Sequence, residues 1–182
     1  MGHFFNERGL KNLQTYRCTA DDLFSFKVNK RREDDANRFS TELIMHKPWY
    51  SQFIMGRDIN FGLIKEVAAY FRVSLTAAAI RYAHIGQHPV AVILSRDGKT
   101  AWSCISDSFP LKWIPKGYPV KKESVAYPFF SGKEIQSAPG LMPAWVWFSE
   151  DVRCRRDMIL YEENVPMKHY HSVLTMLWKS GF

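Results

Sequence analysis

Cysteine is scarce in this sequence, and its few cysteines lie far apart. Cys18, Cys104 and Cys154 are odd in number among 182 residues, and no two of them form a Cys-x-x-Cys pair. This pattern favours reduced thiols over a disulfide framework or a zinc ribbon. We therefore expect three buried, inert cysteines, as is typical of a cytosolic protein.

Long hydrophobic runs are also missing. No segment approaches the roughly 18 consecutive apolar residues that would span a bilayer. The N-terminal residues lack the basic segment, apolar core and small-residue cleavage site of a signal peptide. Together with the cysteine pattern, these absences predict a cytoplasmic protein without a membrane partner.

A charge of one sign is not concentrated in any region. The formal net charge is +7, of which residues 1–89 carry +4 and residues 90–182 carry +3. The densest basic run, residues 30–32, is followed at once by the acidic residues 33–35. Because the positive charge is spread evenly along the sequence and forms no basic cluster that could bind a phosphate backbone, we expect no direct nucleic-acid partner.

The first half of the sequence has helical periodicity. Apolar residues recur at helical spacing over residues 32–45, 61–71 and 74–83. Carboxylates occupy the first turn of the first segment, where they favour the helix dipole, and Pro48 is expected to end that helix. Ser74 is suited to cap the third helix.

The second half has the features of a β-sheet. Residues 90–95 and 100–106 flank Asp97-Gly98, a hairpin-turn signal, and six prolines between positions 110 and 143 indicate long loops. Further strands are predicted at residues 144–148, 157–161 and 173–178. The predicted fold is α+β, with a helical half (1–88) followed by an antiparallel β-sheet half (89–182) that has long proline-rich loops.

The segment that begins at Glu33 carries the most specific pattern. Residues 33–45 read Glu-Asp-Asp-Ala-Asn-Arg-Phe-Ser-Thr-Glu-Leu-Ile-Met. Glu33 and Asn37 are four residues apart and share one helix face, so one can bind a metal while the other steadies its surroundings. The other face, through Phe39 and Leu43, is free to pack. A simpler interpretation of Glu33 is a carboxylate at the start of an amphipathic helix.

This segment resembles the second motif of the ImmA/IrrE zinc metallo-endopeptidases, Glu-x-x-Ala-Asn-x-Phe-Ala-x-x-Leu-Leu-Met-Pro, with departures at Ser40 and His46. Residues 1–5, Met-Gly-His-Phe-Phe, match the end of the family's His-Glu-x-x-His helix. Residues 64–82 resemble its downstream Leu-Ala-x-x-Phe-x-Val-Ser stretch. The three elements occur in the family's order and cover about residues 1–86.

The resemblance implies a zincin-like fold for residues 1–88, with Zn²⁺ as the cofactor. It assigns His3 and Glu33 as zinc ligands, and Asn37, on the same helix face as Glu33, is then the residue that steadies the ligand shell. The family's first His and its general-base Glu would precede Met1. We therefore expect the chain as written to bind zinc weakly and to lack peptidase activity. A misplaced start codon and a genuine truncation are both compatible with the sequence.

Family members of this kind are intracellular, and the best understood cleave helix-turn-helix repressors, which releases mobile-element or DNA-damage genes. The resemblance thus implies a repressor-type protein substrate. One alternative is a non-catalytic remnant that binds the same partner. Another is a DNA-binding helix-turn-helix at residues 64–82, in which Arg81 is the only base-reading cation of the second helix.

The β-rich half matches no motif, and it is predicted to recognise a substrate or a signal. Its tryptophans either line such a surface or fill the core of the sheet, and the core is the commoner role. His84 and His88 have the spacing of a metal-binding pair, but residue 85 is Ile, and Gly86 weakens the helix there. We expect these two histidines to be solvated, and we assign no role to His169 and His171.

Overall fold

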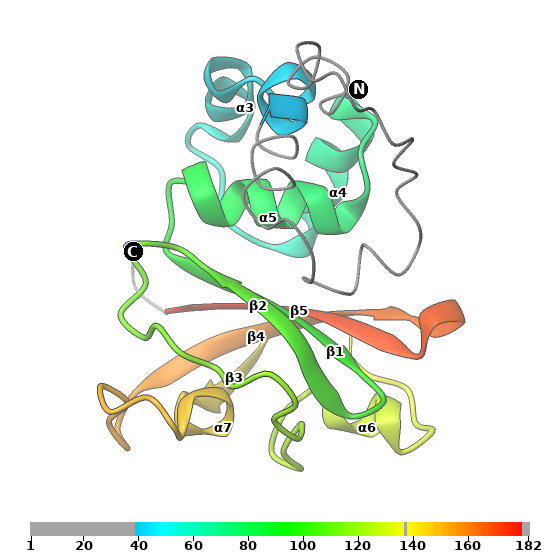
Figure 1. Ribbon diagram of the computed structural model, residues 1–182, viewed down its shortest axis with the longest axis vertical. Helices are drawn as coiled ribbons and strands as arrows, with labels where there is room; N and C mark the ends of the chain where they lie inside the picture. Colours follow the sequence, from blue (N-terminus) through cyan, green and yellow to red (C-terminus); the bar gives the residue numbers. More distant parts are fainter. Residues whose placement is uncertain (1–38, 137, 180–182) are drawn as a thin grey trace, which may run out of the picture. The chain divides into compact units, whose positions relative to one another are not determined.

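The computed structural model, shown in Figure 1, describes residues 39–136 and 138–179 of the chain. The chain divides into two compact units, Met1–Tyr50 and Ser51–Phe182. In the first unit, residues 39–44 are helical, as predicted for the end of the helix over residues 32–45. Phe39 and Leu43 of its expected apolar face are exposed, whereas Met45 is buried. The start of this helix lies outside the described residues.

The helix over residues 32–45 ends before Pro48, as predicted, but the chain begins another helix almost at once. The first helix ends at residue 44, and helix α3 (Lys47–Ile54) contains Pro48 in its first turn. Proline is tolerated there because the first backbone N–H groups of a helix have no partner inside the helix, and its fixed φ suits a helix start. Pro48 therefore belongs to the beginning of a helix.

Helices α4 (Phe61–Phe71) and α5 (Leu75–Ile85) confirm the second and third predicted helices. The Asn60 side chain accepts a hydrogen bond from the Leu63 N–H at 2.8 Å, and the Ser74 hydroxyl accepts one from the Ala77 N–H at 3.1 Å. Each cap satisfies one N–H that the first turn leaves without a partner.

The second unit contains a five-stranded antiparallel sheet with the strand order β2-β1-β5-β4-β3. The predicted hairpin forms β1 (Val90–Arg96) and β2 (Lys99–Ile105), and Asp97 and Gly98 both have positive φ, as its two-residue turn requires. The predicted last strand is β5 (Ser172–Lys179). The described residues therefore confirm an α+β fold in which helices precede an antiparallel sheet.

The segment Trp145–Phe148 is a short helix, α7, and the prediction of a strand there is wrong. The Ala144 carbonyl accepts hydrogen bonds from the N–H groups of Trp147 and Phe148 at 3.2 and 3.0 Å. An uninterrupted apolar run has no alternation that would separate a buried strand from a buried helical turn. The neighbouring strands are β3 (Gly140–Pro143) and β4 (Ile159–Met167).

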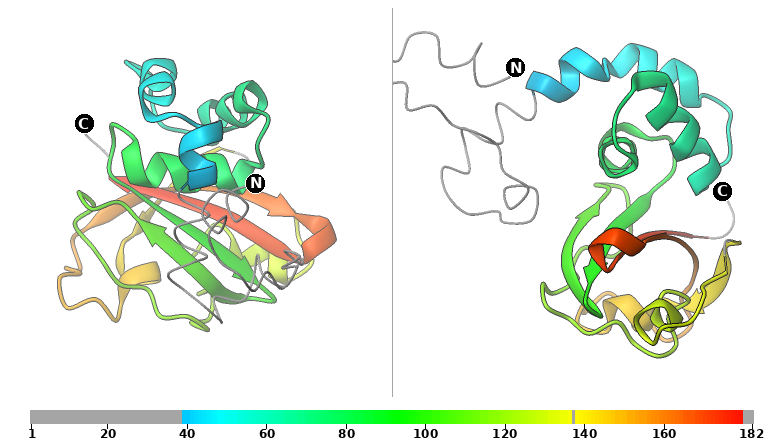
Figure 2. Two further views of the ribbon diagram at one scale, coloured as in Figure 1. Left: turned by 45° about the horizontal axis from the view of Figure 1, so that its top comes forward. Right: turned by 90° about the vertical axis from the view of Figure 1, so that its right-hand side faces the viewer.

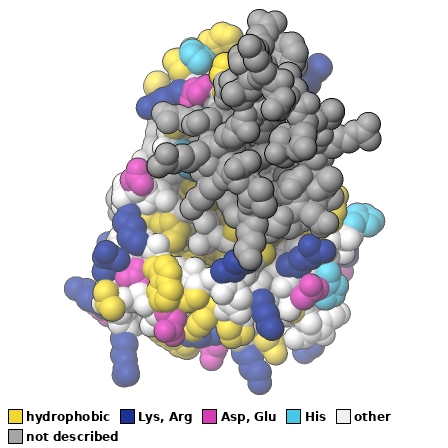
Figure 3. All heavy atoms as spheres, in the orientation of Figure 1, with side chains coloured by type: hydrophobic (Ala, Val, Ile, Leu, Met, Phe, Trp, Pro, Cys, Tyr) yellow, Lys and Arg dark blue, Asp and Glu magenta, His cyan; other side chains and the backbone are white. Residues whose placement is uncertain are grey.

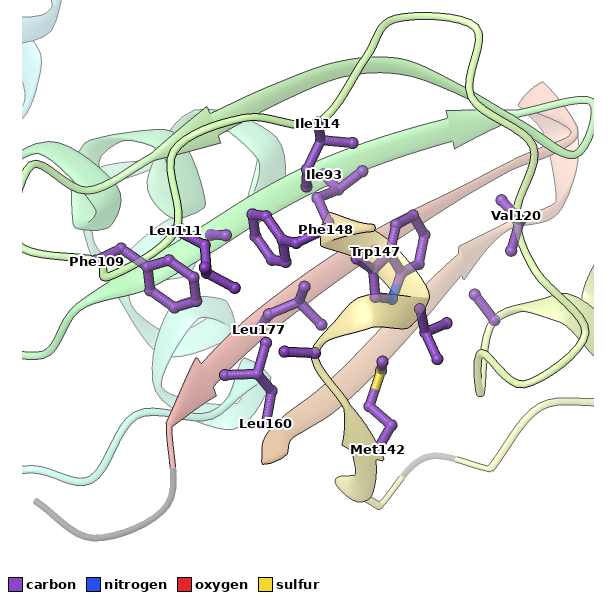
Figure 4. Close-up of a cluster of buried hydrophobic side chains, with 14 of the residues drawn as sticks. Ile93, Phe109, Leu111, Ile114, Val120, Met142, Trp147, Phe148, Leu160 and Leu177 are labelled. Atoms are coloured by element: carbon purple, nitrogen blue, oxygen red, sulfur yellow. The ribbon is translucent and has the colours of Figure 1, made fainter. Parts of the chain in front are cut away.

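A hydrophobic core lies between one face of the sheet and the long connection from β2 to β4 (Figure 4). Trp147 and Phe148 of α7 are buried in it. Figure 4 labels ten of its side chains, from strands and from the connection: Ile93, Phe109, Leu111, Ile114, Val120, Met142, Trp147, Phe148, Leu160 and Leu177. The connection therefore covers the sheet as a second layer although much of it is irregular.

The opposite face of the sheet carries α4 and α5, whereas α6 (Tyr127–Phe130) and α7 lie on the core side (Figure 2). Residues 90–95 of β1 and residues 172–177 of β5 are buried throughout. Continuous burial is expected of central strands that are covered on both faces. A 3-10 turn, η1 (Lys168–Tyr170), joins β4 to β5.

Candidate functional site

The three residues that sequence analysis assigned to a metal site, His3, Glu33 and Asn37, lie outside the described residues. Within residues 39–136 and 138–179, no group of three or more His, Cys, Asp or Glu side chains is arranged to hold a metal ion. The candidate sites below therefore come from the second unit alone.

The pair α4–α5 is fixed to the sheet by a buried carboxylate. Glu163 of β4 accepts a hydrogen bond from the Phe61 N–H, the first of α4, at 2.7 Å. The helix N-terminus attracts negative charge, but burial outweighs this and raises the pKa of Glu163; the Phe61 bond and the charge of Lys65 act in the opposite direction. Glu163 thus joins β4 to α4 through a hydrogen bond between residues that are 102 positions apart in the sequence.

A second carboxylate, Glu162, organises the core side of the same strand. Glu162 is fully buried, and it accepts hydrogen bonds from four donors: Ser124 Oγ at 2.8 Å, Ala126 N at 3.0 Å, Asn164 Nδ2 at 2.9 Å and Trp147 Nε1 at 3.1 Å. A buried carboxylate is tolerated when donors satisfy its oxygens. Glu162 therefore ties the connection and α7 to the sheet, which is a structural role.

His84 and His88 do not lie on one helix, as the i, i+4 spacing of a metal-binding pair would require. His84 lies in the last turn of α5, but His88 follows the helix, which ends at Ile85. His84 is exposed as expected, with its Nε2 atom 3.3 Å from Cys104 Sγ of β2, whereas His88 is half-buried. Burial, with a smaller contribution from Asp107, raises the pKa of Cys104 to about 11, so its thiol stays protonated at neutral pH.

His171, to which sequence analysis assigned no role, has a partner. Its Nδ1 atom lies 3.1 Å from Asp97 Oδ1, and its carbonyl accepts a hydrogen bond from the Asp97 N–H at 3.2 Å. The contact links the β1–β2 turn to the start of β5. Both residues have positive φ and both side chains are largely exposed, which is consistent with a link between two turns.

A pocket of about 570 Å³ opens beside α7, and its described lining residues are Trp145, Ser149, Cys154 and Arg156. Trp145 begins α7, and the other three follow it on the way to β4. Cys154 is half-buried, and burial raises the pKa of its thiol; Asp151 also raises it, whereas Lys121 lowers it. Cys104 and Cys154 are therefore free thiols, but neither is fully buried as predicted.

The tryptophans of the sheet half differ in burial, and Trp145 and Trp147 both pack in or against the core. Trp147 is buried in the core and Trp113 is 53% exposed, whereas Trp145 lines the pocket. Trp178 stacks on Tyr161 with ring centroids 5.5 Å apart. The pocket was not predicted. Its signal in the sequence was the run Arg153-Cys154-Arg155-Arg156, which gathers three cations within four residues of the loop.

No protein-family model matches the chain, and no curated protein sequence is significantly similar to it. None of the helices within the described ranges is long and apolar enough to cross a membrane.

Proposed function

We propose that the protein is a zinc-dependent endopeptidase of the ImmA/IrrE type, directed at a helix-turn-helix repressor-type protein. His3 and Glu33 would belong to the zinc ligand set, and Asn37 would steady it. Zinc held in this way would act as a Lewis acid on a peptide carbonyl. The proposal rests on the order of the three sequence elements that resemble the family.

The observation that best supports this proposal is the structure of the third element. Residues 64–82 fall within α4 and α5, two capped helices joined by a tight turn in which Arg72 has a left-handed conformation. Both helices present buried apolar faces, and contacts with β1, β2 and β4 pack them on the sheet. The third element therefore forms a pair of packed helices, as its apolar periodicity predicts.

The alternative, in which α5 reads DNA, is disfavoured by the position of Arg81. A reading helix must present its cations to a groove, but Arg81 is only 6% exposed. On the face shown in Figure 3, the lysine and arginine side chains of the described residues are dispersed among acidic and apolar ones. Arg81, the cation that the reading helix would use, is therefore not presented to a phosphate backbone or a base edge.

Zinc stoichiometry provides the first test. The chain as written is compared with a chain that carries His-Glu immediately before Met1, which completes the His-Glu-x-x-His motif through His3. The extended chain should retain about one zinc ion after dialysis, as three protein ligands allow, and the chain as written far less. Inductively coupled plasma mass spectrometry measures the metal content.

Two matched variants of the extended chain make this test specific. Glu33→Gln should lose the metal, whereas Glu42→Gln, on the same predicted helix, should retain it. New peptide termini in a proteome-derived mixture, formed only without chelator, would establish cleavage. The proposal is wrong if the extended chain retains no zinc or if the two variants behave alike. Stoichiometric zinc without cleavage would favour the non-catalytic alternative, a protein that only binds the repressor-type partner.

A further inference from the structure

The pocket beside α7 is a half-open depression in the surface. Its volume of about 570 Å³ lies within the range of ligand pockets in proteins. Val146, Trp147 and Phe148 anchor α7 in the core, so the helix has a rigid support. Trp145, on the same helix, is half-buried and lines the pocket. The aromatic wall is therefore held in place before any ligand binds.

A second segment of the chain braces this wall. The Lys121 ammonium lies 4.9 Å from the centroid of the Trp145 ring and 5.3 Å from that of Tyr118, and it donates a hydrogen bond to the Trp145 carbonyl at 3.1 Å. The Tyr118 hydroxyl is hydrogen-bonded to Ser149 Oγ. Lys121 therefore adds positive charge next to the pocket while its side chain is fixed by three contacts.

Of the three arginines between α7 and β4, Arg156 is the one that is available to bind an anion. Arg153 pairs with Asp151 at 3.4 Å, and Arg155 pairs with Asp157 at 2.7 Å. Arg156 is exposed and lines the pocket, and no carboxylate in the described part of the chain forms an ion pair with it. The described lining contains no acidic side chain, and the nearest carboxylate contact is that of Glu150 Oε1 with Ser149 Oγ at 3.4 Å. A guanidinium in this setting is suited to bind a carboxylate or a phosphate through two parallel hydrogen bonds.

We propose that this pocket binds a small molecule that combines an aromatic ring with an anionic group. The ring contacts Trp145, and the anion binds Arg156 in the field of Lys121. A nucleoside monophosphate and an aromatic carboxylate share this chemistry. The inference rests on the pocket alone and does not depend on the proposed peptidase activity.

Calorimetric titration of the chain as written tests the proposal with two probes, adenosine monophosphate and indole-3-carboxylate. Adenosine and inorganic phosphate serve as controls that carry only the ring or only the anion. At least one probe should bind with a Kd below about 1 mM, and each control should bind at least about tenfold more weakly. Binding of one probe but not the other identifies the source of the anion as phosphate or carboxylate.

Arginine variants locate the binding site. Arg156→Gln should weaken binding by about tenfold or more, whereas Arg155→Gln, an equal change of charge one residue away, should change it by less than about twofold. Both side chains are exposed, and circular dichroism checks that the variants fold. Equal effects of the two variants, or no binding of either probe at about 5 mM, would overturn the proposal.

Thiol labelling of the unmodified chain gives a second measurement. The bound probe should slow the reaction of N-ethylmaleimide with Cys154, which lines the pocket, and leave Cys104 of β2 unaffected as an internal reference. Peptide mass spectrometry measures the two labelling rates separately. Equal protection of both cysteines, or protection of neither at a saturating probe concentration, would contradict binding in this pocket.

Discussion

Two neighbouring glutamates on β4 show how the environment determines the effect of a residue. Glu162 and Glu163 are adjacent in the sequence, so their side chains point to opposite faces of the sheet. Glu162 accepts four hydrogen bonds on the core side, whereas Glu163 accepts one from the first N–H of α4. Substitution of Glu162 and substitution of Glu163 should therefore affect the stability of the protein in different ways.

Glu162→Gln should destabilise the protein strongly. The amide places an NH₂ group where the carboxylate accepted hydrogen bonds, so buried donors face one another without an acceptor. We expect the free energy of unfolding to fall by about 2–4 kcal/mol, measured by urea denaturation. The exposed Glu134→Gln serves as the control and should change it by less than about 0.5 kcal/mol. Similar effects of the two substitutions would contradict the assigned role of Glu162.

Glu163→Gln should alter the dependence of stability on pH. Because burial raises the pKa of Glu163 in the folded state, that state holds the proton more tightly than the unfolded chain does. The contribution of Glu163 is therefore fully present below the ordinary glutamate pKa and is lost as the pH rises through the folded value.

Urea denaturation from about pH 4 to pH 7 measures this dependence. The glutamine variant lacks the ionisation, and its Oε1 atom can still accept from the Phe61 N–H. Its stability relative to the unmodified chain should therefore increase with pH. Glu123→Gln, which replaces an exposed carboxylate, is the control and should follow the unmodified chain. A constant difference between the Glu163 variant and the unmodified chain over this pH range would count against the raised pKa.

At the scale of single elements, capping residues next to each helix determine where the helices α4 and α5 begin and end. The boundaries of α4 agree with the predicted residues 61–71, because Asn60 caps its start and Arg72, in a left-handed conformation, ends it. Ser74 likewise caps α5 as predicted. Such signals act within one helical turn and can be recognised without knowledge of the tertiary structure.

Removal of the α5 cap should have a modest and reversible effect. Ser74→Ala leaves the Ala77 N–H without its acceptor and should lower the free energy of unfolding by about 1 kcal/mol. Ser74→Asp, which restores an acceptor at a helix N-terminus, should recover most of this loss. Chemical denaturation measures both variants, with the exposed Ser131→Ala as the control. An equal loss in the alanine and aspartate variants would contradict the capping role.

At the scale of the whole molecule, the second compact unit has its own hydrophobic core. Ser51–Phe182 contains the complete sheet, the core and the helix pair α4–α5. A fragment of residues 47–182, which keeps α3 intact, should therefore fold by itself with one cooperative transition. Far-ultraviolet circular dichroism during urea denaturation measures this. A gradual loss of signal without a transition would show that the fragment needs residues 1–46.

The candidate sites could be predicted from the sequence less well than the fold, because they combine residues from distant segments. The pocket combines Trp145 and Arg156 with Lys121, and the helix contact combines Glu163 with Phe61. No local pattern indicates that these residues meet, because they are far apart in the sequence. The three-arginine run was the one local signal of the pocket, and it did not distinguish the paired arginines from Arg156.

The sequence by itself determined the α+β class, the capped helices, the Asp97-Gly98 hairpin and β5, because caps, turns and periodicity act between neighbouring residues. Only the tertiary structure decided that Trp145–Phe148 is helical, that the strand order is β2-β1-β5-β4-β3, and that Glu162 and Glu163 are buried. The physical reason is that burial and strand pairing depend on contacts between distant segments. The Glu163–Phe61 hydrogen bond, for example, spans 102 residues.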